Sequence, residues 1–156
     1  MAFIKAQIQN SFVFKHSSCE RCQGHDGLEN ILSSINAFKK GKLICVFGCG
    51  GNRDSVKRSI MGEIAGSLAD YCVLTSDNPR FEEPEKIIDQ IEEGIKNTTC
   101  SYVRNADRFS AIKHAVAYAK KDDIIVICGK GDEDYQEIMG VKHHFSDREA
   151  VEKIFS

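Results

Sequence analysis

The sequence contains no long apolar run and no excess of charge of one sign. No window of its 156 residues approaches the ~18 uninterrupted apolar residues that a membrane-spanning helix needs. Residues 1–10 also lack the basic segment and apolar core of a signal peptide. Twenty-one basic residues against 23 acidic ones give a net charge of -2, which supplies no basic surface for a nucleic-acid backbone. We therefore predict a cytoplasmic chain without a membrane span or a nucleic-acid partner.

A Walker phosphate-binding loop is also missing, because no lysine in the chain is followed by serine or threonine. A disulfide scaffold is not indicated either, since the seven cysteines are odd in number. Cys45, Cys72 and Cys128 stand inside apolar runs. We expect these three side chains to be small buried hydrophobic groups in a reducing compartment.

The chain has the length of one domain, and apolar runs alternate with helical patterns along most of it. Strands buried on both faces are predicted by short β-branched runs at residues 42–48, 71–76, 100–105 and 123–129. Helices are predicted at residues 26–41, 56–70, 84–97, 107–121 and 146–155. This alternation predicts an α/β fold with a Rossmann-like, doubly wound and mostly parallel sheet.

Residues at the helix ends and on the helix faces support these boundaries. Pro84 suits a first helical position, Asp107 suits an N-cap, Gly41 is a natural stop, and the last helix reads as capped. Three apolar stripes should face inward: Ile60, Met61, Ile64, Ala65 and Leu68; Ile87, Ile88, Ile91 and Ile95; and Phe109, Ile112, Ala115, Val116 and Ala119.

Residues 1–25 depart from this alternation. They hold one alternating run that fits an edge strand, followed by a polar segment with His16, Cys19, Cys22 and His25 at intervals of three. These four side chains are zinc-competent, but the spacing matches no known framework. We therefore divide the chain into an unrelated leader at residues 1–25 and one domain at residues 26–156.

Three unusual segments follow predicted strands, and ligands of open parallel sheets collect at the carboxyl ends of strands. "GCGGNRD" (48–54) is either a tight glycine turn or a loop that presents Arg53 to a carboxylate. Its arginine stands where the dinucleotide fingerprint needs a third glycine. The turn alone therefore does not decide the ligand.

The other two segments carry opposite charges. In "DNPR" (77–80), Asp77 and Arg80 form either a solvated turn or a rigid loop that aims Arg80 at an anion. "GKGDEDYQ" (129–136) is either a polar connection or a site where Glu133 accepts an ammonium beside the free carbonyl of Gly129. Arginines on one side and an acid on the other suit an amino acid that is charged at both ends.

Residues 26–155 resemble the C-terminal domain of a Mur ligase of the diaminopimelate-adding type. The segments that carry the resemblance are "DGLENIL", "VFGCGGNRDSVKRSIMGEIA", "TSDNPRFEEPEKII", "GKGDEDYQE" and "FSDREAV". Such enzymes add the third residue to UDP-MurNAc-L-Ala-D-Glu in peptidoglycan synthesis, and ATP with Mg²⁺ activates the D-glutamyl carboxylate.

The resemblance implies roles for six residues and assigns no catalytic group. Arg80 would bind the second carboxylate of meso-diaminopimelate, which lysine lacks, and Asp77 would brace its loop. Asn78 and Arg53 would help to hold the substrate, while Gly129 and Glu133 would bind an ammonium and its polar neighbours. The family's UDP-sugar and ATP domains have no counterpart in this sequence, so we expect neither ATP binding nor ligation by this chain alone.

The sequence departs from the family pattern at four places. Asn52 stands for aspartate, Ser59 for proline and Asp132 for histidine, and "CERCQGH" replaces the hinge motif that helps the family's nucleotide site. Two other hypotheses therefore stay open. The chain could be a stand-alone or vestigial non-catalytic binding module, or a nucleotide-binding domain that uses the glycine turn and Asp77.

Overall fold

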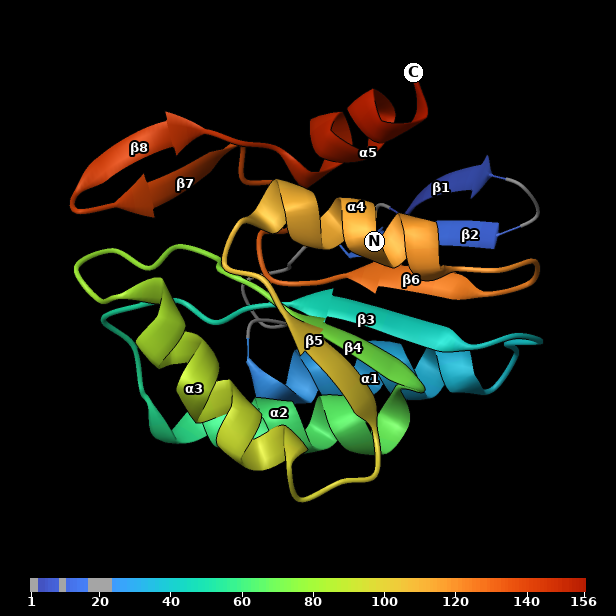
Figure 1. Ribbon diagram of the computed structural model, residues 1–156, viewed down its shortest axis with the longest axis horizontal. Coiled ribbons are helices and arrows are strands. Elements are labelled where there is room, and N and C mark those ends of the chain that lie inside the picture. The colour runs from blue at the N-terminus through green and yellow to red at the C-terminus, as the bar shows by residue number, and fades with distance from the viewer. Residues whose placement is uncertain (1–2, 9–10, 17–23) are drawn as a thin grey trace.

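Six strands form one sheet in the order β1-β2-β6-β3-β4-β5 (Figure 1). The computed structural model describes residues 3–8, 11–16 and 24–156. All strand pairs from β2 to β5 are parallel, and β1 alone runs antiparallel to β2. The strands are β1 Phe3–Ile8, β2 Ser11–His16, β3 Leu43–Phe47, β4 Tyr71–Leu74, β5 Ser101–Arg104 and β6 Ile124–Ile127.

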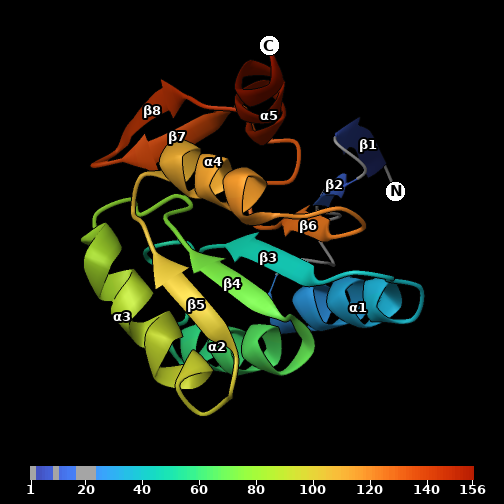
Figure 2. The ribbon, with the colours of Figure 1, turned by 45° about the vertical axis from the view of Figure 1, so that its right-hand side comes forward.

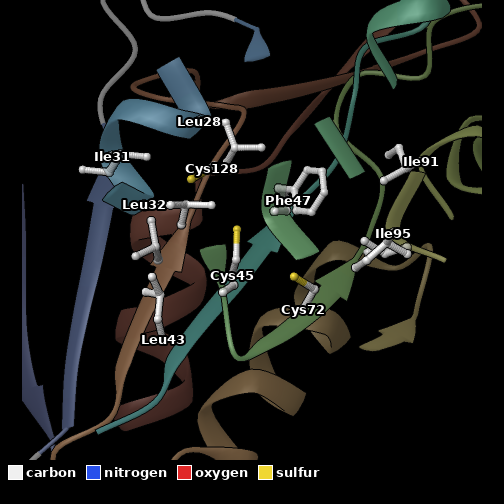
Figure 3. Packing of buried hydrophobic residues seen from close by; sticks show 14 of the residues in the cluster. Leu28, Ile31, Leu32, Leu43, Cys45, Phe47, Cys72, Ile91, Ile95 and Cys128 are labelled. Carbon is white, nitrogen blue, oxygen red and sulfur yellow. The ribbon is translucent and has the colours of Figure 1, made fainter. Parts of the chain in front are cut away.

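Helices cover both faces of this sheet (Figures 1 and 2). One face carries α1 (His25–Asn36), α2 (Val56–Leu68) and α3 (Pro84–Ile95), and the other carries α4 (Arg108–Tyr118) and α5 (Asp147–Phe155). Successive residues of β3 point to opposite faces. Cys45 and Phe47 therefore join the first core (Figure 3), and Ile44 and Val46 join the second. The doubly wound, mostly parallel α/β fold is confirmed.

Half of the predicted inward positions are buried, and most of the others are half-buried. The four isoleucines of α3 are at most 2% exposed, and α3 begins at Pro84 as predicted. Asp107 caps α4 by accepting a hydrogen bond from the Ser110 amide at 2.9 Å. Cys45, Cys72 and Cys128 are buried free thiols, which confirms the prediction for these three.

Four details of the prediction are wrong. β5 is half exposed, because it lies at the edge of the sheet and, among the described residues, pairs with β4 alone. Ile60 is 38% exposed, because α2 turns its glycine face towards α3. α1 ends at Asn36, and Gly41 instead allows close approach to the Asp122 carbonyl. Ser146 occupies the N-cap position of α5, but its side chain makes no cap hydrogen bond.

A hairpin interrupts the predicted alternation before the last helix. β7 (Tyr135–Ile138) and β8 (Val141–His144) pair antiparallel as a separate two-stranded sheet. Its turn contains Met139 and Gly140, both with positive φ. The hairpin contacts the "DNPR" loop through a bridge between Arg80 and Ile138, and it therefore matters for the site.

The N-terminal residues add two strands where the sequence predicted one. β1 lies at the edge of the sheet, and β2 pairs with β6. Cys19 and Cys22 lie outside the described residues, so the zinc hypothesis stays a prediction. In the described part of the chain, no helix combines the length and apolar character needed to cross a membrane.

Candidate functional site

The strand order brings three loops to one point. The chain runs from β3 to β4 and β5 on one side and then returns to β6 on the other side of β3. Such a reversal leaves a crevice at the carboxyl ends of the strands. A cavity of about 360 Å³ lies there between the loops after β3, β4 and β6, and the start of α1 contributes to its wall. Its lining includes all six predicted site residues: Arg53, Asp77, Asn78, Arg80, Gly129 and Glu133.

The glycine turn after β3 is packed against the "DNPR" loop. A Cβ atom on Gly51 would lie 1.8 Å from the Pro79 carbonyl oxygen, and the Gly51 amide donates to the Asn78 carbonyl at 2.8 Å. Asn52 has a φ of 52°, a left-handed conformation that asparagine tolerates better than most residues. Its Oδ1 accepts from the Phe81 amide at 3.2 Å. The Pro79 backbone thus packs directly against Gly51.

An ion pair between the buried Arg58 and the half-buried Glu82 holds the same two loops together. Arg58 of α2 is 2% exposed, and its Nη1 and Nη2 donate to the two carboxylate oxygens of Glu82 at 2.8 and 2.9 Å. Nη2 also donates to the Gly50 carbonyl at 3.0 Å, and the Asn52 amide donates to Glu82 at 2.6 Å. The hydrogen bonds from Arg58 and Asn52 lower the pKa of Glu82 to about 2. The pair therefore fixes the cavity wall near Arg53.

Arg80 takes its position from the hairpin that the sequence did not predict. Its backbone exchanges hydrogen bonds with Glu137 and Met139, at 2.9 and 2.7 Å. Its φ of 52° is unusual for a residue other than glycine. Its Nη1 donates to the Gly51 carbonyl at 2.7 Å, and its Nε lies 3.4 Å from Glu137 Oε2. Arg80 lines the cavity, and its guanidinium carries five N–H groups. It therefore retains hydrogen-bond donors that a ligand could use.

Asn78 connects the second and third loops. Its Nδ2 donates to Glu133 Oε2 at 2.8 Å, and its Oδ1 accepts from the Glu137 amide at 3.0 Å and from Lys130 Nζ at 3.2 Å. Asn78 is 3% exposed, so these partners determine its orientation. Glu133 is thereby held in place on the cavity wall.

The Asp77 carboxylate can accept a further hydrogen bond. Within the described residues, its buried Oδ1 accepts no hydrogen bond, and Lys130 Nζ lies 3.7 Å from it. Burial raises the pKa of this carboxyl, and the positive charges of Arg108 and Lys130 oppose the rise. An unsatisfied buried acceptor beside a cavity is costly unless a ligand uses it. Asp77 is thus a candidate partner for a cationic group.

The two remaining predicted residues complete the wall. Arg53 is exposed at the mouth of the cavity, after the glycine turn. Gly129 has a φ of 115°, which favours glycine, and it lies beside the Asp77 carboxylate. The cavity also has an apolar part, formed by Leu28, Ile31, Phe47 and Met61.

Arg108 lies beneath these loops and is 1% exposed. It forms a bidentate pair with Asp147 of α5, at 2.7 and 2.9 Å, and donates to the carbonyls of Ser76 and Cys128 at 3.1 and 2.9 Å. These two carbonyls immediately precede Asp77 and Gly129. Arg108 was not predicted from the sequence. Its one distinguishing feature there is its position directly after the N-cap residue Asp107.

Comparison with protein families gives a match over most of the chain. Residues 25–131 match the family described as Mur ligase, glutamate ligase domain. The chain belongs to this family. The resemblance noted in the sequence is therefore confirmed.

Two relatives in this family are UDP-N-acetylmuramoyl-L-alanyl-D-glutamate–2,6-diaminopimelate ligases, from Caldanaerobacter subterraneus subsp. tengcongensis and from Clostridioides difficile. Each is 51% identical over 131 residues, which is 84% of this chain and 27% of the relative. A solved structure of a ligase with the same name superposes with a TM-score of 0.89 at 36% identity, covering 97% of this chain and 30% of that one. The chain thus spans about a quarter of the length of the curated relatives that it matches.

A more distant solved structure, a murein peptide ligase from Psychrobacter arcticus, is 17% identical with a TM-score of 0.63. At that identity it shows a shared fold alone. Two departures from the Mur ligase pattern lie in ordered parts of the structure. Asn52 occupies a left-handed position, and the Ser59 hydroxyl donates to the Val56 carbonyl at 3.2 Å within α2.

Proposed function

We propose that this chain is the amino-acid-binding domain of a ligase that adds meso-diaminopimelate to UDP-MurNAc-L-Ala-D-Glu in cytoplasmic peptidoglycan synthesis. The observation that carries the proposal is the single cavity lined by Arg53, Arg80, Asp77 and Glu133. Two cationic and two anionic side chains match a substrate that carries two carboxylates and two ammonium groups. The names of the relatives give the same substrate for those enzymes.

Each end of the substrate has its own partners in this proposal. Arg80 binds the carboxylate that distinguishes diaminopimelate from lysine, and Arg53 and Asn78 help to hold the remaining polar groups. Glu133, Asp77 and the Gly129 carbonyl accept hydrogen bonds from an ammonium. The chain selects and orients the incoming amino acid, whose free amine would attack the activated D-glutamyl carboxylate.

ATP and Mg²⁺ belong to the complete ligase in this proposal. The described residues do not fit a triphosphate, because the glycine turn is packed against Pro79 and the sequence has no Walker lysine. We assign no step of phosphoryl transfer to this chain, and UDP-MurNAc-dipeptide would bind to the parts of the ligase outside it. The same packing disfavours a dinucleotide site at this turn.

Calorimetric titration of the purified chain with meso-diaminopimelate and with L-lysine tests the proposal. We expect diaminopimelate to bind at least about tenfold more tightly, since a charge-assisted pair to Arg80 contributes about 1.4 kcal/mol or more. Arg80→Met should remove this preference. Arg148→Met is the matched control, because Arg148 is exposed on α5 and should leave the preference intact. Equal binding of both amino acids, or binding of neither, would contradict the proposal.

A further inference from the structure

Lys130 is a buried lysine directly behind the cavity wall. Its side chain is 0% exposed, and lysine is rarely buried to this extent unless it is paired. Its Nζ lies 3.2 Å from Asn78 Oδ1, 3.7 Å from Asp77 Oδ1 and 3.8 Å from Glu133 Oε2. Lys130 does not line the cavity itself. Its Nζ lies within 3.8 Å of three side chains that do.

The first consequence concerns the Asn78 amide. An amide group can present either its oxygen or its nitrogen to a neighbour. Because Lys130 Nζ and the Glu137 amide are both donors, Asn78 must turn Oδ1 towards them. Nδ2 then faces Glu133 Oε2 and binds it at 2.8 Å. In the described part of the chain, Glu133 Oε1 keeps its capacity to accept from a ligand.

The second consequence concerns the charge of Asp77. The groups that face this carboxylate are Arg108 from α4, Asp147 from α5, Cys49 after β3, and Lys130 and Glu133 after β6. Two of the five are cations, and Lys130 approaches Asp77 Oδ1 to within 3.7 Å. Loss of Lys130 would leave a buried carboxylate near two other acids with Arg108 as its single facing cation. Its protonation would then begin at a higher pH.

We propose that Lys130 is a positioning residue of the amino-acid site. It orients the Asn78 amide, which holds Glu133, and stabilises the negative charge of Asp77, so that both carboxylates can accept a substrate ammonium. Lys130 itself does not touch the substrate. The inference rests on the proposed function in one respect, namely that the ligand carries an ammonium group.

Titration of meso-diaminopimelate into the Lys130→Met chain at pH 6 and pH 8 tests the role of the charge. Methionine keeps the length of the side chain and removes its charge. An ammonium-binding carboxylate loses its ligand as the pH falls through its pKa, and this pKa is higher in the variant. We expect a severalfold loss of affinity at pH 6 and a smaller loss at pH 8, because more of the carboxylate is protonated at the lower pH.

Lys113→Met is the matched control, because Lys113 is exposed on α4 and the charge change is the same. Its affinity should equal that of the unaltered chain at both pH values. A Lys130→Met chain with unchanged affinity, or with equal losses at pH 6 and pH 8, would overturn the inference. Equal losses would mean that Lys130 does not keep Asp77 ionised.

A ligand-free measurement on the unaltered chain keeps the inference testable if the variant does not fold. Burial lowers the pKa of Lys130. The side-chain amide signals of Asn78 in NMR spectra should therefore shift in step with the Lys130 titration, below the ordinary lysine value of about 10.4. If these signals do not respond, the inference is overturned even where diaminopimelate binds. If they respond and no diaminopimelate binds, the proposed function fails while the orienting role of Lys130 stands.

Discussion

The ion pair between Arg58 and Glu82 fixes the shape of the site. Glu82 lies just beyond the "DNPR" loop and Arg58 lies in α2, yet their side chains form two hydrogen bonds of 2.8 and 2.9 Å. Arg58 also reaches Gln90 Oε1 at 2.6 Å. A charged group that is buried and bidentate is costly to leave without its partner. The pair therefore couples the stability of the chain to the geometry of the cavity.

Substitution Glu82→Gln should destabilise the chain at pH 7 by about 1–3 kcal/mol, the range expected when a charged hydrogen bond is lost. The pKa of Glu82 in the folded chain is about 2, below its usual value of 4.5. Its contribution to stability is therefore fully present above about pH 5 and is lost as the pH falls towards 2. The unaltered and Glu82→Gln chains should therefore differ less in their free energy of unfolding at pH 3 than at pH 5. Urea unfolding measures this difference.

Glu93→Gln is the control for this experiment, because Glu93 is an exposed glutamate on the outer side of α3. Its free energy of unfolding should change little at either pH. A Glu82→Gln chain that loses the same stability at pH 3 and pH 5 would show that the carboxylate charge is not responsible.

The convergence of the six predicted residues on one cavity was predictable from the sequence, because loops after parallel strands converge. The burial of Lys130, Arg58 and Arg108 was not predictable, because a charged residue in a helix or between two glycines normally indicates exposure. Their burial depends on partners that are distant in the sequence, such as Asp147 for Arg108 and Glu82 for Arg58. Hydrophobic periodicity contains no information about such pairs.

Among the elements, α2 and α3 approach each other unusually closely through glycines. A Cβ atom on Gly94 of α3 would lie 1.7 Å from the Ser59 carbonyl of α2, and one on Gly62 would lie 2.0 Å from the Ile91 carbonyl. No side-chain rotation relieves a clash with backbone. The position of α2, which carries Arg58 and follows the glycine turn, is therefore set by α3.

Substitution Gly94→Ala should destabilise the chain by about 3 kcal/mol, at the upper end of the usual cost of overpacking. Helix propensity works in the opposite direction by about 1 kcal/mol, so a net loss would be due to the backbone contact. Ser67→Ala on the exposed side of α2 is the control and should be neutral or slightly stabilising. Thermal and urea unfolding would measure the stability of both variants. A Gly94→Ala chain with unchanged stability would contradict the close packing of α2 and α3.

The helices and strands with strong patterns were predictable, whereas the hairpin was not. The isoleucines of α3 recur at helical spacing, so its position followed directly. β7 and β8 are short, and their residues are exposed or half buried, so no alternation separates them from a loop. Their pairing depends on contacts with Arg80, which lies more than 50 residues earlier. Exposure of β5 was likewise missed, because it depends on strand order.

At the scale of the whole molecule, the strand order produces the site. β6 returns to the side of β3 opposite β4, so that loops after three strands meet at one cavity. Arg108 then ties the ends of β4 and β6 together from below, through the carbonyls of Ser76 and Cys128. The amino ends of the strands hold a different cluster, with Tyr71 stacked on Tyr118 at 3.9 Å between ring centroids. The two ends of the sheet are thus chemically distinct.

Mapping of meso-diaminopimelate binding by NMR on the isotopically labelled chain tests the central claim most directly. The account predicts that the backbone amide signals of Gly51, Asn78, Arg80, Gly129 and Glu133 shift with a common saturation curve. It also predicts that signals at the amino ends of the strands, such as those of Tyr71 and Tyr118, stay in place. An absence of shifts, or shifts confined to the Tyr71 end of the sheet, would contradict it.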